Sequence, residues 1–417
     1  MGNVSALDSG DTAWILVSTA LVLFMTLPGL ALFYGGLVRT KNVLSVLMQC
    51  FALAALVTLI WLAFGYSVAF EPSGYEKGAL GLHSFVGGLS KSFLAGIGGS
   101  TLRGTIPEPL FFAYQLTFAI ITPALIVGAF AERMKFSALL LFSVLWLVAV
   151  YLPIYHMVWG GQGALFADLG VLDFAGGILV HITAGVAALV ACSVIGPRRG
   201  YPRTAMPPHS LTMTVMGTGM LWVGWFGFNA GSALAANGTA ATALVATHVS
   251  ASAAALTWMA IEWRTFGRPS MLGVATGAVA GLASVTPVSG FIGPVGALVI
   301  GSMAAVVCRY ASTQAKRSLG YDDSLDVFGV HGVGGLLGTL LVAFFASDIF
   351  GGNQVDLAMG RQFGLQVVAA LFAVVYTAAL SWGILRVVMA LTGLRVDEAD
   401  ETRGLDISIH GEEGYNL

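Results

Sequence analysis

Two histidines lie in the middle of long apolar stretches, where an ionisable side chain is costly. His181 and His331 are each followed four residues later by a glycine, Gly185 and Gly335. Residues four apart share a face of a helix, so a second backbone can approach beside each ring. Two facing imidazoles that share a proton must adopt complementary tautomers. We predict such a proton-sharing pair; two unrelated packing histidines are the alternative.

An aspartate precedes each of these histidines in a glycine-rich context. The segments are DFAGGILVH, which begins at Asp173, and DVFGVH, which begins at Asp326. Both aspartates lie near the predicted start of a helix, where a carboxylate can accept hydrogen bonds from free backbone N–H groups. Structural anchoring is therefore the favoured interpretation of both.

Aromatic side chains form a second constellation. Two sets follow the i, i+3, i+7 spacing of one helix face: Phe111, Tyr114 and Phe118, and Trp225, Phe228 and Ser232. Trp159 stands at the end of another apolar stretch. Aromatic faces attract a small cation and replace part of its lost hydration, and the Ser232 hydroxyl adds an acceptor. This pattern favours a vestibule for a monovalent cation that donates hydrogen bonds; an aromatic belt with lipid-facing side chains is the alternative.

The other histidines and the cysteines show no metal or nucleophile pattern, so we expect no metal and no cofactor. We interpret His83, His209 and His410 as solvated, His156 as interfacial and His248 as a partner in helix-to-helix hydrogen bonding. The three cysteines lie in apolar runs and are interpreted as small packing residues: Cys50, Cys192 and Cys308.

The composition identifies the solvent around these residues. Of the 417 residues, 57% are apolar and 10% are charged, and the mean hydropathy is +0.85. Soluble domains carry roughly 25% charged residues, so most of this chain must face lipid. The 19 basic and 21 acidic residues nearly balance, which argues against nucleic-acid binding.

Windows of about 20 apolar residues predict an all-α polytopic membrane protein with eleven transmembrane helices. The predicted spans lie near 11–35, 43–70, 108–130, 136–157, 174–196, 210–232, 241–261, 271–288, 291–310, 325–346 and 363–391. Small residues make 271–288 the weakest of these. Residues 1–392 thus form one transmembrane domain, and 393–417 form an acidic tail that by itself has the composition of a disordered segment.

The basic residues alternate between the two sides of these spans. Fifteen of the nineteen fall on one side, and the other side holds only Lys77, Lys91, Arg103 and Arg361. Cytoplasmic flanks carry the excess of positive charge, so the N-terminus is predicted outside and the C-terminus inside. Residues 71–106 are then an external segment, which we expect to include a short surface helix.

Eleven spans divide into two groups of five and a final helix. His181 and His331 fall in the fifth and tenth spans, at equivalent positions of the two groups. Because five is odd, such halves would be inverted relative to each other, with functional groups at their interface near the bilayer midplane. We predict inverted halves at about 11–196 and 210–346, followed by a last helix at 363–391.

Six segments, which together reach across almost the whole chain, carry a family resemblance. They are PGLALFYGGLVRTKN, FAERMKF, DFAGGILVHITAG, WFGFNAGS, DVFGVHGVGG and GLDISIHGEEGYN. In order and spacing they resemble the ammonium transporter/methylammonium permease/Rhesus family, in its bacterial and archaeal ammonium-transporter branch. The resemblance implies eleven helices in inverted fives, a homotrimer in the cell membrane and a narrow hydrophobic pore through each subunit. It also implies a PII-type signalling protein as a partner at the cytoplasmic face, where the tail lies.

The resemblance further assigns roles to residues of this chain. It implies an external ammonium site at Trp159, Tyr114, Phe118 and Ser232, a phenyl gate of Phe118 and Phe228, and pore histidines at His181 and His331. Asp173 would be the acid that supports recruitment, and Thr286 matches a threonine near the external mouth. Tyr114 departs from the common phenylalanine of the family, and its hydroxyl is expected to alter the polarity of the site.

The resulting hypothesis is a transporter, not an enzyme. Ammonium would bind at the aromatic site and lose a proton, ammonia would cross the pore, and the proton would pass separately by way of the imidazoles. Potassium has no proton to give up and would be excluded. An ammonium sensor on the same fold, electroneutral conduction and an intramembrane enzyme that uses the histidines as acid and base are the alternatives.

Overall fold

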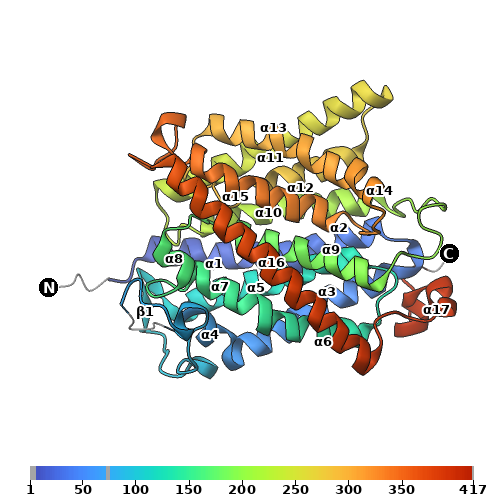
Figure 1. The fold of residues 1–417 in the computed structure, drawn as a ribbon, viewed down its shortest axis with the longest axis horizontal. Coiled ribbons are helices and arrows are strands. Elements are labelled where there is room, and N and C mark those ends of the chain that lie inside the picture. The colour runs from blue at the N-terminus through green and yellow to red at the C-terminus, as the bar shows by residue number, and fades with distance from the viewer. Residues whose placement is uncertain (1–5, 72–75, 416–417) are drawn as a thin grey trace.

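Long apolar helices lie side by side in the computed structural model, which describes residues 6–71 and 76–415 (Figure 1). Apart from one short hairpin, the regular secondary structure of the described chain is helical. The helices are α1 (Ser9–Phe24), α2 (Ala31–Leu37), α3 (Val43–Ile60), α4 (Tyr66–Phe70), α5 (Glu108–Phe130), α6 (Phe136–Trp146), α7 (Leu152–Trp159), α8 (Leu165–Leu169), α9 (Thr183–Ile195), α10 (Leu211–Gly231), α11 (Gly238–Phe266), α12 (Met271–Val285), α13 (Pro294–Tyr310), α14 (Lys316–Leu319), α15 (Val333–Phe345), α16 (Met359–Thr392) and α17 (Glu398–Arg403).

Ten continuous helical segments of the described chain are long and apolar enough to cross a membrane. They are Ser9–Leu37, Thr40–Phe70, Glu108–Phe130, Phe136–Trp159, Gly177–Ile195, Leu211–Gly231, Gly238–Phe266, Pro294–Leu319, Phe328–Phe345 and Met359–Thr392. Each coincides with a predicted span. The remaining prediction, 271–288, corresponds to α12, which has 15 residues and a length of about 22 Å. Because α12 is shorter than the hydrocarbon core, the count of eleven spans stays a prediction.

Several of these segments change from α to π geometry part-way along. In the first, the π-helical turn Met25–Leu30 contains Pro28, which has no N–H to donate to the regular ladder. Two further turns, Gly177–Ile182 and Phe328–Gly332, contain His181 and His331. Single π turns within α-helices occur often at functional sites. Here they set the direction of the two imidazoles.

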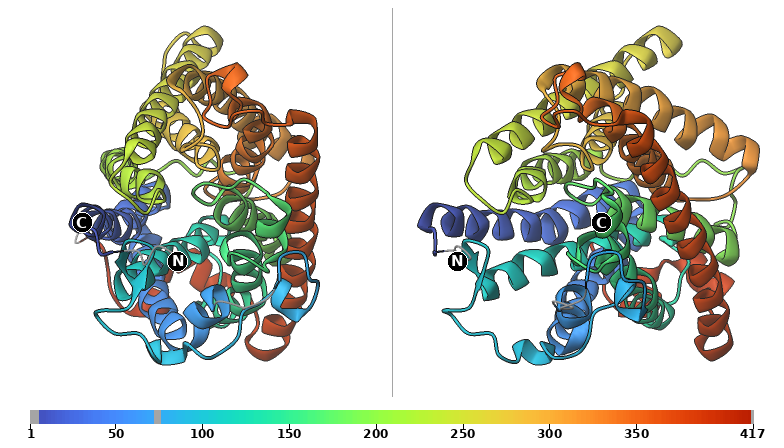
Figure 2. Two further views of the ribbon diagram at one scale, coloured as in Figure 1. Left: turned by 90° about the vertical axis from the view of Figure 1, so that its left-hand side faces the viewer. Right: turned by 60° about the vertical axis from the view of Figure 1, so that its left-hand side comes forward.

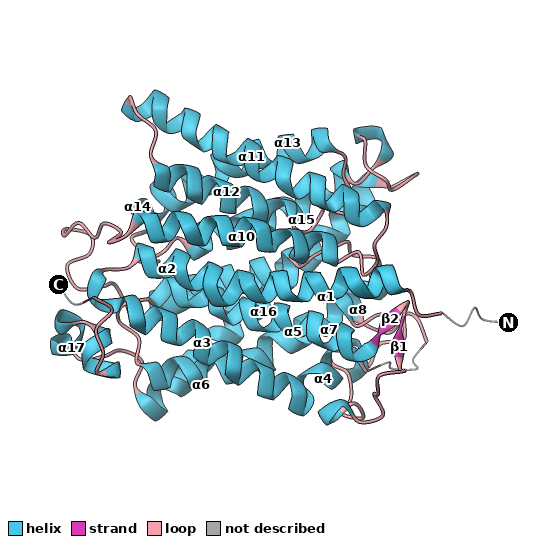
Figure 3. Ribbon diagram, turned by 180° about the vertical axis from the view of Figure 1, so that it is seen from behind, coloured by secondary structure: helices cyan, strands magenta, loops and turns pink. Residues whose placement is uncertain are grey.

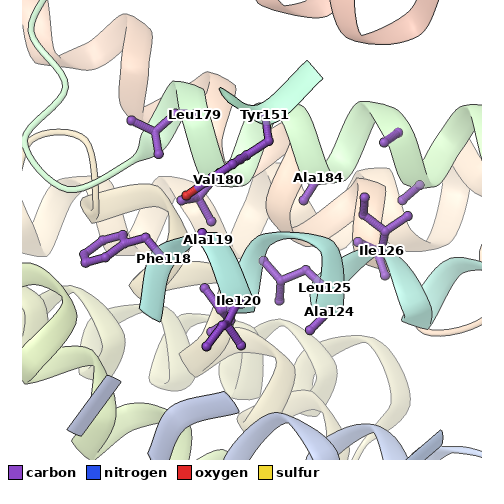
Figure 4. Close-up of a cluster of buried hydrophobic side chains, with 14 of the residues drawn as sticks. Phe118, Ala119, Ile120, Ala124, Leu125, Ile126, Tyr151, Leu179, Val180 and Ala184 are labelled. Atoms are coloured by element: carbon purple, nitrogen blue, oxygen red, sulfur yellow. The ribbon is translucent and has the colours of Figure 1, made fainter. Parts of the chain in front are cut away.

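The apolar side chains are divided between an interior and an outer surface. Phe118, Ile120, Leu125, Tyr151 and Val180 are buried together where α5 contacts its neighbours (Figure 4). The long α16 instead runs obliquely along the outside of the bundle, in contact with α6, α9 and α15 (Figures 1 and 2). It exposes large apolar side chains such as those of Leu371 and Val375. An apolar outer surface of this kind fits a surrounding lipid phase.

The face near the N-terminus, here called the N-terminal face, carries the segment 71–106. A surface helix was expected there, and its described residues contain instead 3₁₀ turns at Leu82–Ser84 and Ser92–Leu94. Strands β1 (Leu102–Arg103) and β2 (Ile106–Pro107) form an antiparallel hairpin beside the start of α5 (Figure 3). Glycine-rich composition favours such turns over a continuous helix, so that prediction was wrong.

The C-terminal tail lies at the opposite end of the bundle, here called the tail face (Figure 1). Its composition suggested disorder, yet α17 and the π-helical turn Asp406–His410 are folded against the loops. The carboxylate of Asp406 accepts hydrogen bonds from the N–H groups of Leu44 (3.0 Å) and Ser45 (2.7 Å), at the first turn of α3. The tail is therefore ordered by polar contacts with the membrane domain rather than by a core of its own.

Three histidines expected to be solvated are partly buried instead. His209 contacts the carbonyl oxygen of Val38 (2.8 Å) and the hydroxyl of Tyr415 (3.0 Å) through its two ring nitrogens. His410 packs edge-on against Phe136, and His83 contacts the carbonyl of Ala79 at 2.9 Å. Backbone carbonyls and rings from distant segments replace the water that loop positions suggested.

Two more histidines also differ from expectation. His156 is only 1% exposed, and its ring nitrogens contact the carbonyl oxygens of Ala69 (3.0 Å) and His83 (2.8 Å) rather than an interface. His248 was expected to hydrogen-bond between helices, but it is exposed on α11 and contacts the rings of Trp222 and Phe226 on α10. The three cysteines are buried, in keeping with a packing role.

Glu401 joins the tail to the loop after α9 through polar contacts of its carboxylate. Its carboxylate pairs with Arg395 (2.7 Å) and accepts the N–H of Arg199 (2.7 Å), although it is only 2% exposed. Glu401→Ala would leave the N–H of Arg199 without its acceptor and would remove the ion pair of Arg395, which keeps only the carbonyl oxygens of Ile195 and Pro197, so local opening of the tail should increase roughly tenfold. Limited trypsin digestion at Arg403 measures this opening. Glu398→Ala removes an 87% exposed carboxylate from the same helix, and equal cleavage rates for the two variants would contradict the assignment.

Candidate functional site

Asp173 organises the start of the helical segment that carries His181. Its Oδ1 accepts hydrogen bonds from the N–H groups of Gly176 (2.8 Å) and Gly177 (2.6 Å), and its Oδ2 accepts from Ile178 (2.7 Å). Burial raises the pKa of Asp173 to about 6, and the three N–H groups act in the opposite direction. The carboxylate thus satisfies the free donors of the helix start, as the anchoring interpretation predicted.

The second histidine segment has the same kind of anchor, at a different residue from the one predicted. Asp323, eight residues before His331, accepts the N–H of Phe328 through Oδ2 at 2.7 Å. Asp326 instead pairs with Lys316 at 2.7 Å. The eight-residue interval that separates Asp173 from His181 also separates Asp323 from His331. That equal spacing was the available signal, and the assignment of Asp326 as a cap was wrong.

Glycines let the two histidine segments cross at very short range. A Cβ atom added at Gly185 would lie 2.2 Å from the Cα and N atoms of Gly332. One added at Gly335 would lie 2.6 Å from the Cβ of His181. Real Cβ atoms never come this close to a neighbouring backbone, so only glycine permits this approach.

The crossing places the two buried imidazoles against each other. The Nδ1 atoms of His181 and His331 are 3.2 Å apart, and the rings are stacked with centroids 5.2 Å apart and an angle of 18°. One Nδ1 must donate and the other accept, so at any moment the neutral pair holds complementary tautomers. Within the described chain, the Nε2 atom of His181 has no hydrogen-bond partner. The pair therefore retains an open position for a proton or a polar solute.

An aromatic stack lies next to the histidines. The rings of Phe118 and Phe228 have centroids 4.3 Å apart at 33°, and Trp159 meets Phe118 edge-on at 5.5 Å. His181 in turn stacks on Trp225 (5.6 Å) and Phe228 (6.1 Å). The aromatic face of α5 thus packs against the aromatic face of α10, and Phe118 and Phe228 form the contact between the two faces.

Tyr114 does not direct its hydroxyl to open space. The Tyr114 hydroxyl is in hydrogen-bond contact with the carbonyl oxygens of Gly227 (2.9 Å) and Phe228 (3.1 Å). It lies 3.4 Å from the Ser232 hydroxyl. Ser232 donates to the same Phe228 carbonyl at 2.8 Å. The extra hydroxyl of Tyr114 therefore fixes the backbone behind the phenyl stack, and the Tyr114 side chain is fully buried.

Two predicted site residues accept hydrogen bonds from the indole N–H groups of tryptophans. The carbonyl oxygen of Asp173 accepts the indole N–H of Trp159 at 2.8 Å, which fixes that ring at the end of α7. Thr286 was expected near the external mouth, but it is fully buried and accepts the indole N–H of Trp225 at 2.9 Å. Its hydroxyl donates to the Leu282 carbonyl oxygen at 2.8 Å, and Thr286 is not among the residues that line the three cavities described below. Thr286 positions Trp225.

Three cavities follow one another past these residues. A cavity of about 470 Å³ on the N-terminal face is lined by Trp159, Ser232 and Gln115 among others. A small apolar cavity of about 10 Å³ lies between Phe228 and the histidines, and this volume suffices for about one water-sized molecule. A third, of about 190 Å³, begins at His331 and reaches Asp326 and Arg198 on the tail face. The phenyl stack separates the first two cavities, and His331 borders the last two.

Among the residues that the structure describes, no three His, Cys, Asp or Glu side chains are grouped as metal ligands. The line of cavities narrows from a wide aromatic vestibule to an apolar passage with two imidazoles. Such an arrangement suits a small solute that can be cationic in the vestibule and neutral in the passage.

Comparison with known proteins agrees with this geometry. Residues 13–415 match the family described as the Ammonium Transporter Family. The chain belongs to the ammonium transporter family. An ammonium transporter of Aquifex aeolicus is 46% identical over 414 residues, which cover 99% of this chain and 94% of that protein. Members of this family are multi-pass membrane proteins, and so is this chain.

Solved structures of the family share the fold. Mep2 of Candida albicans superimposes with a TM-score of 0.85 and 32% identity, and covers 94% of this chain and 87% of its own. A structure named Sensor Amt Protein gives a TM-score of 0.87 with 26% identity, over 96% of this chain and 98% of its own. The ammonium transporter fold therefore extends over nearly the whole chain.

The crossing at Gly185 gives a direct test of the site's architecture. Gly185→Ala would place a methyl group against the Gly332 backbone, so the two segments must separate or the fold must loosen, at a cost of about 1–3 kcal/mol. We expect a lower melting temperature in detergent, measured by fluorescence. Gly383→Ala on α16 is the control, since a Cβ there meets no atom within 4 Å. Equal melting temperatures for both variants would show that the crossing tolerates a methyl group.

Proposed function

We propose that this protein transports ammonium by binding the cation at the N-terminal face, removing a proton and conducting neutral ammonia past the two histidines. The observation that carries this proposal is the small apolar cavity between Phe228 and the histidine pair. It has room for one ammonia-sized molecule and offers a bare cation almost nothing but hydrocarbon and ring atoms. The names of the relatives and of the matching family agree with ammonium as the solute.

Recruitment depends on the cavity of about 470 Å³. Trp159 presents its aromatic ring to a cation there, with Phe118 packed edge-on behind it, and the Ser232 oxygen accepts a hydrogen bond from the cation. Cation–π contacts contribute about 0.5–2 kcal/mol each, which offsets part of the lost hydration. Asp173 supports this site by fixing Trp159 and by its own negative charge, while Tyr114 holds the wall behind Phe118.

Deprotonation must come before passage, because a charge in a passage lined by Phe118, Phe228 and aliphatic groups is far too costly. The phenyl pair then acts as a gate that ammonia passes by small ring movements. The proton follows separately through His181 and His331, whose 3.2 Å Nδ1–Nδ1 contact lets it move from one ring to the other. Potassium binds aromatic rings too, but it has no proton to release and stops at the gate.

Orientation and assembly follow from the charge pattern and the family resemblance. The N-terminal face is extracytoplasmic, the tail face is cytoplasmic, and the protein is a homotrimer in the plasma or inner membrane. The two inverted halves, 11–196 and 210–346, meet at the histidine pair. A PII-type protein docks on the tail face, where the ordered tail and the basic loops present polar surface.

Removing either imidazole tests the mechanism. His181→Ala and His331→Ala should lower the ammonium current at least about tenfold, because the path for the proton is broken. The current is measured from proteoliposomes on a solid-supported membrane after an ammonium jump, with potassium as the reference ion. His248→Ala, which removes an exposed imidazole on α11, is the control and should conduct normally.

The mechanism is wrong if both variants keep the wild-type current and the wild-type preference over potassium. If wild-type trimers bind ammonium but give no current, the sensor and electroneutral alternatives remain. A pH-sensitive dye inside the vesicles then separates them: electroneutral entry of ammonia makes the interior alkaline, and a sensor leaves its pH unchanged.

A further inference from the structure

The vestibule on the N-terminal face already contains a cation of the protein itself. Arg103, in β1 of the hairpin, lines the cavity together with Trp159 and Ser232. Its guanidinium carbon lies 4.9 Å from the ring centroid of Phe70 and 4.7 Å from that of Phe111. These two rings meet edge-on at 4.8 Å, so they form an aromatic cleft in which the guanidinium sits.

A hydrogen bond and the register of the hairpin fix the position of Arg103. Its Nη1 donates to the carbonyl oxygen of Phe70 at 3.2 Å, and residue 103 is held in register opposite Ile106 in the hairpin. The buried Ile106 in turn anchors the hairpin to the core. The charge is thereby kept at the cavity wall.

No carboxylate among the described residues forms an ion pair with Arg103. Glu108, at the start of α5, is already bound by Lys91 and accepts the hydroxyl of Tyr66 at 2.7 Å. The carboxylate of Asp173 faces three backbone N–H groups. Within the described chain, Arg103 therefore has no ion-pair partner, next to a site where a cation is expected to bind.

We propose that Arg103 is an affinity-determining residue: it occupies the Phe70–Phe111 cleft as a resident cation and weakens the binding of external cations in the vestibule. The inference rests on the proposed function and adds to it. Without the guanidinium, the cleft would be a second aromatic site able to hold ammonium or potassium. With it, the cleft is filled, and any cation in the vestibule is repelled by a fixed charge that no proton exchange removes.

The expected size of the effect follows from Coulomb's law. A unit charge that lies on the order of 10 Å from the bound cation changes its affinity about three- to tenfold, when the effective dielectric constant is between that of protein and that of water. Salt screens such an interaction with a Debye length of about 30 Å at 0.01 M and about 3 Å at 1 M. The effect of Arg103 should therefore be largest at low ionic strength and nearly vanish at high ionic strength.

The test compares Arg103→Gln, which removes the charge, with Arg103→Lys, which keeps it. For Arg103→Gln we expect the KM of the ammonium current to fall about three- to tenfold at low salt, with the maximal current unchanged. Arg103→Lys should keep a KM close to wild type. Arg361→Gln removes an exposed charge from the same face outside the cavity, and its KM should not change. Calorimetric titration of purified protein with methylammonium measures the same affinity ratio without transport.

The outcomes separate this inference from the proposed function. A wild-type protein that binds methylammonium but carries no current refutes the proposed transport with separate proton transfer, while the binding ratio still decides the role of Arg103. The role is refuted if Arg103→Gln leaves affinity unchanged, if its effect does not depend on salt, or if Arg103→Lys alters affinity equally, which would indicate structural damage. If the folded wild-type protein neither carries a current nor binds methylammonium, both the proposed function and the role of Arg103 are refuted.

Discussion

The close crossing of the two histidine segments, Gly177–Ile195 and Phe328–Phe345, is the constraint on which the rest of this structure depends. Gly185 meets Gly332 and Gly335 meets His181 at distances that no other residue permits. Only at this range do the imidazoles of His181 and His331 come into hydrogen-bond contact in the middle of the bundle. The small apolar cavity borders both histidines, and the cavity of the tail face begins at His331.

Carboxylates at opposite ends of the bundle stabilise this crossing. Asp173 caps the start of the segment that carries His181, near the N-terminal face. Asp323 caps the start of the segment that carries His331, near the tail face. Arg133 strengthens the second end. It is fully buried and donates to the carbonyl oxygens of Ala129, Ala131, Gly196 and Asp322 and to the hydroxyl of Ser324. Strong polar networks are thus confined to the ends, because an unpaired charge in the apolar middle would be too costly.

Much of the site could be read from residue types and spacing. Hydropathy located ten of the spans, because apolar run length reports directly on a lipid solvent. The polar residues within spans were found because any such residue is exceptional there. The error concerns a partner: Asp326 was preferred to Asp323 as the cap, although Asp323 accepts the N–H of Phe328. Residue type states what a side chain can bind, and distance along the chain says little about which group it meets.

The sequence by itself determined the lipid solvent, ten of the membrane-spanning segments, the family and the identity of the two central histidines, since all of these depend on composition, period and local motifs. Only the tertiary structure decided that the acidic tail is ordered, that Tyr114 bonds to backbone carbonyls, and that Arg103 lies in an aromatic cleft of the vestibule. Each of those facts depends on groups far apart in the chain. Their free energy comes from desolvation and from hydrogen-bond geometry, and both exist only once the helices have packed.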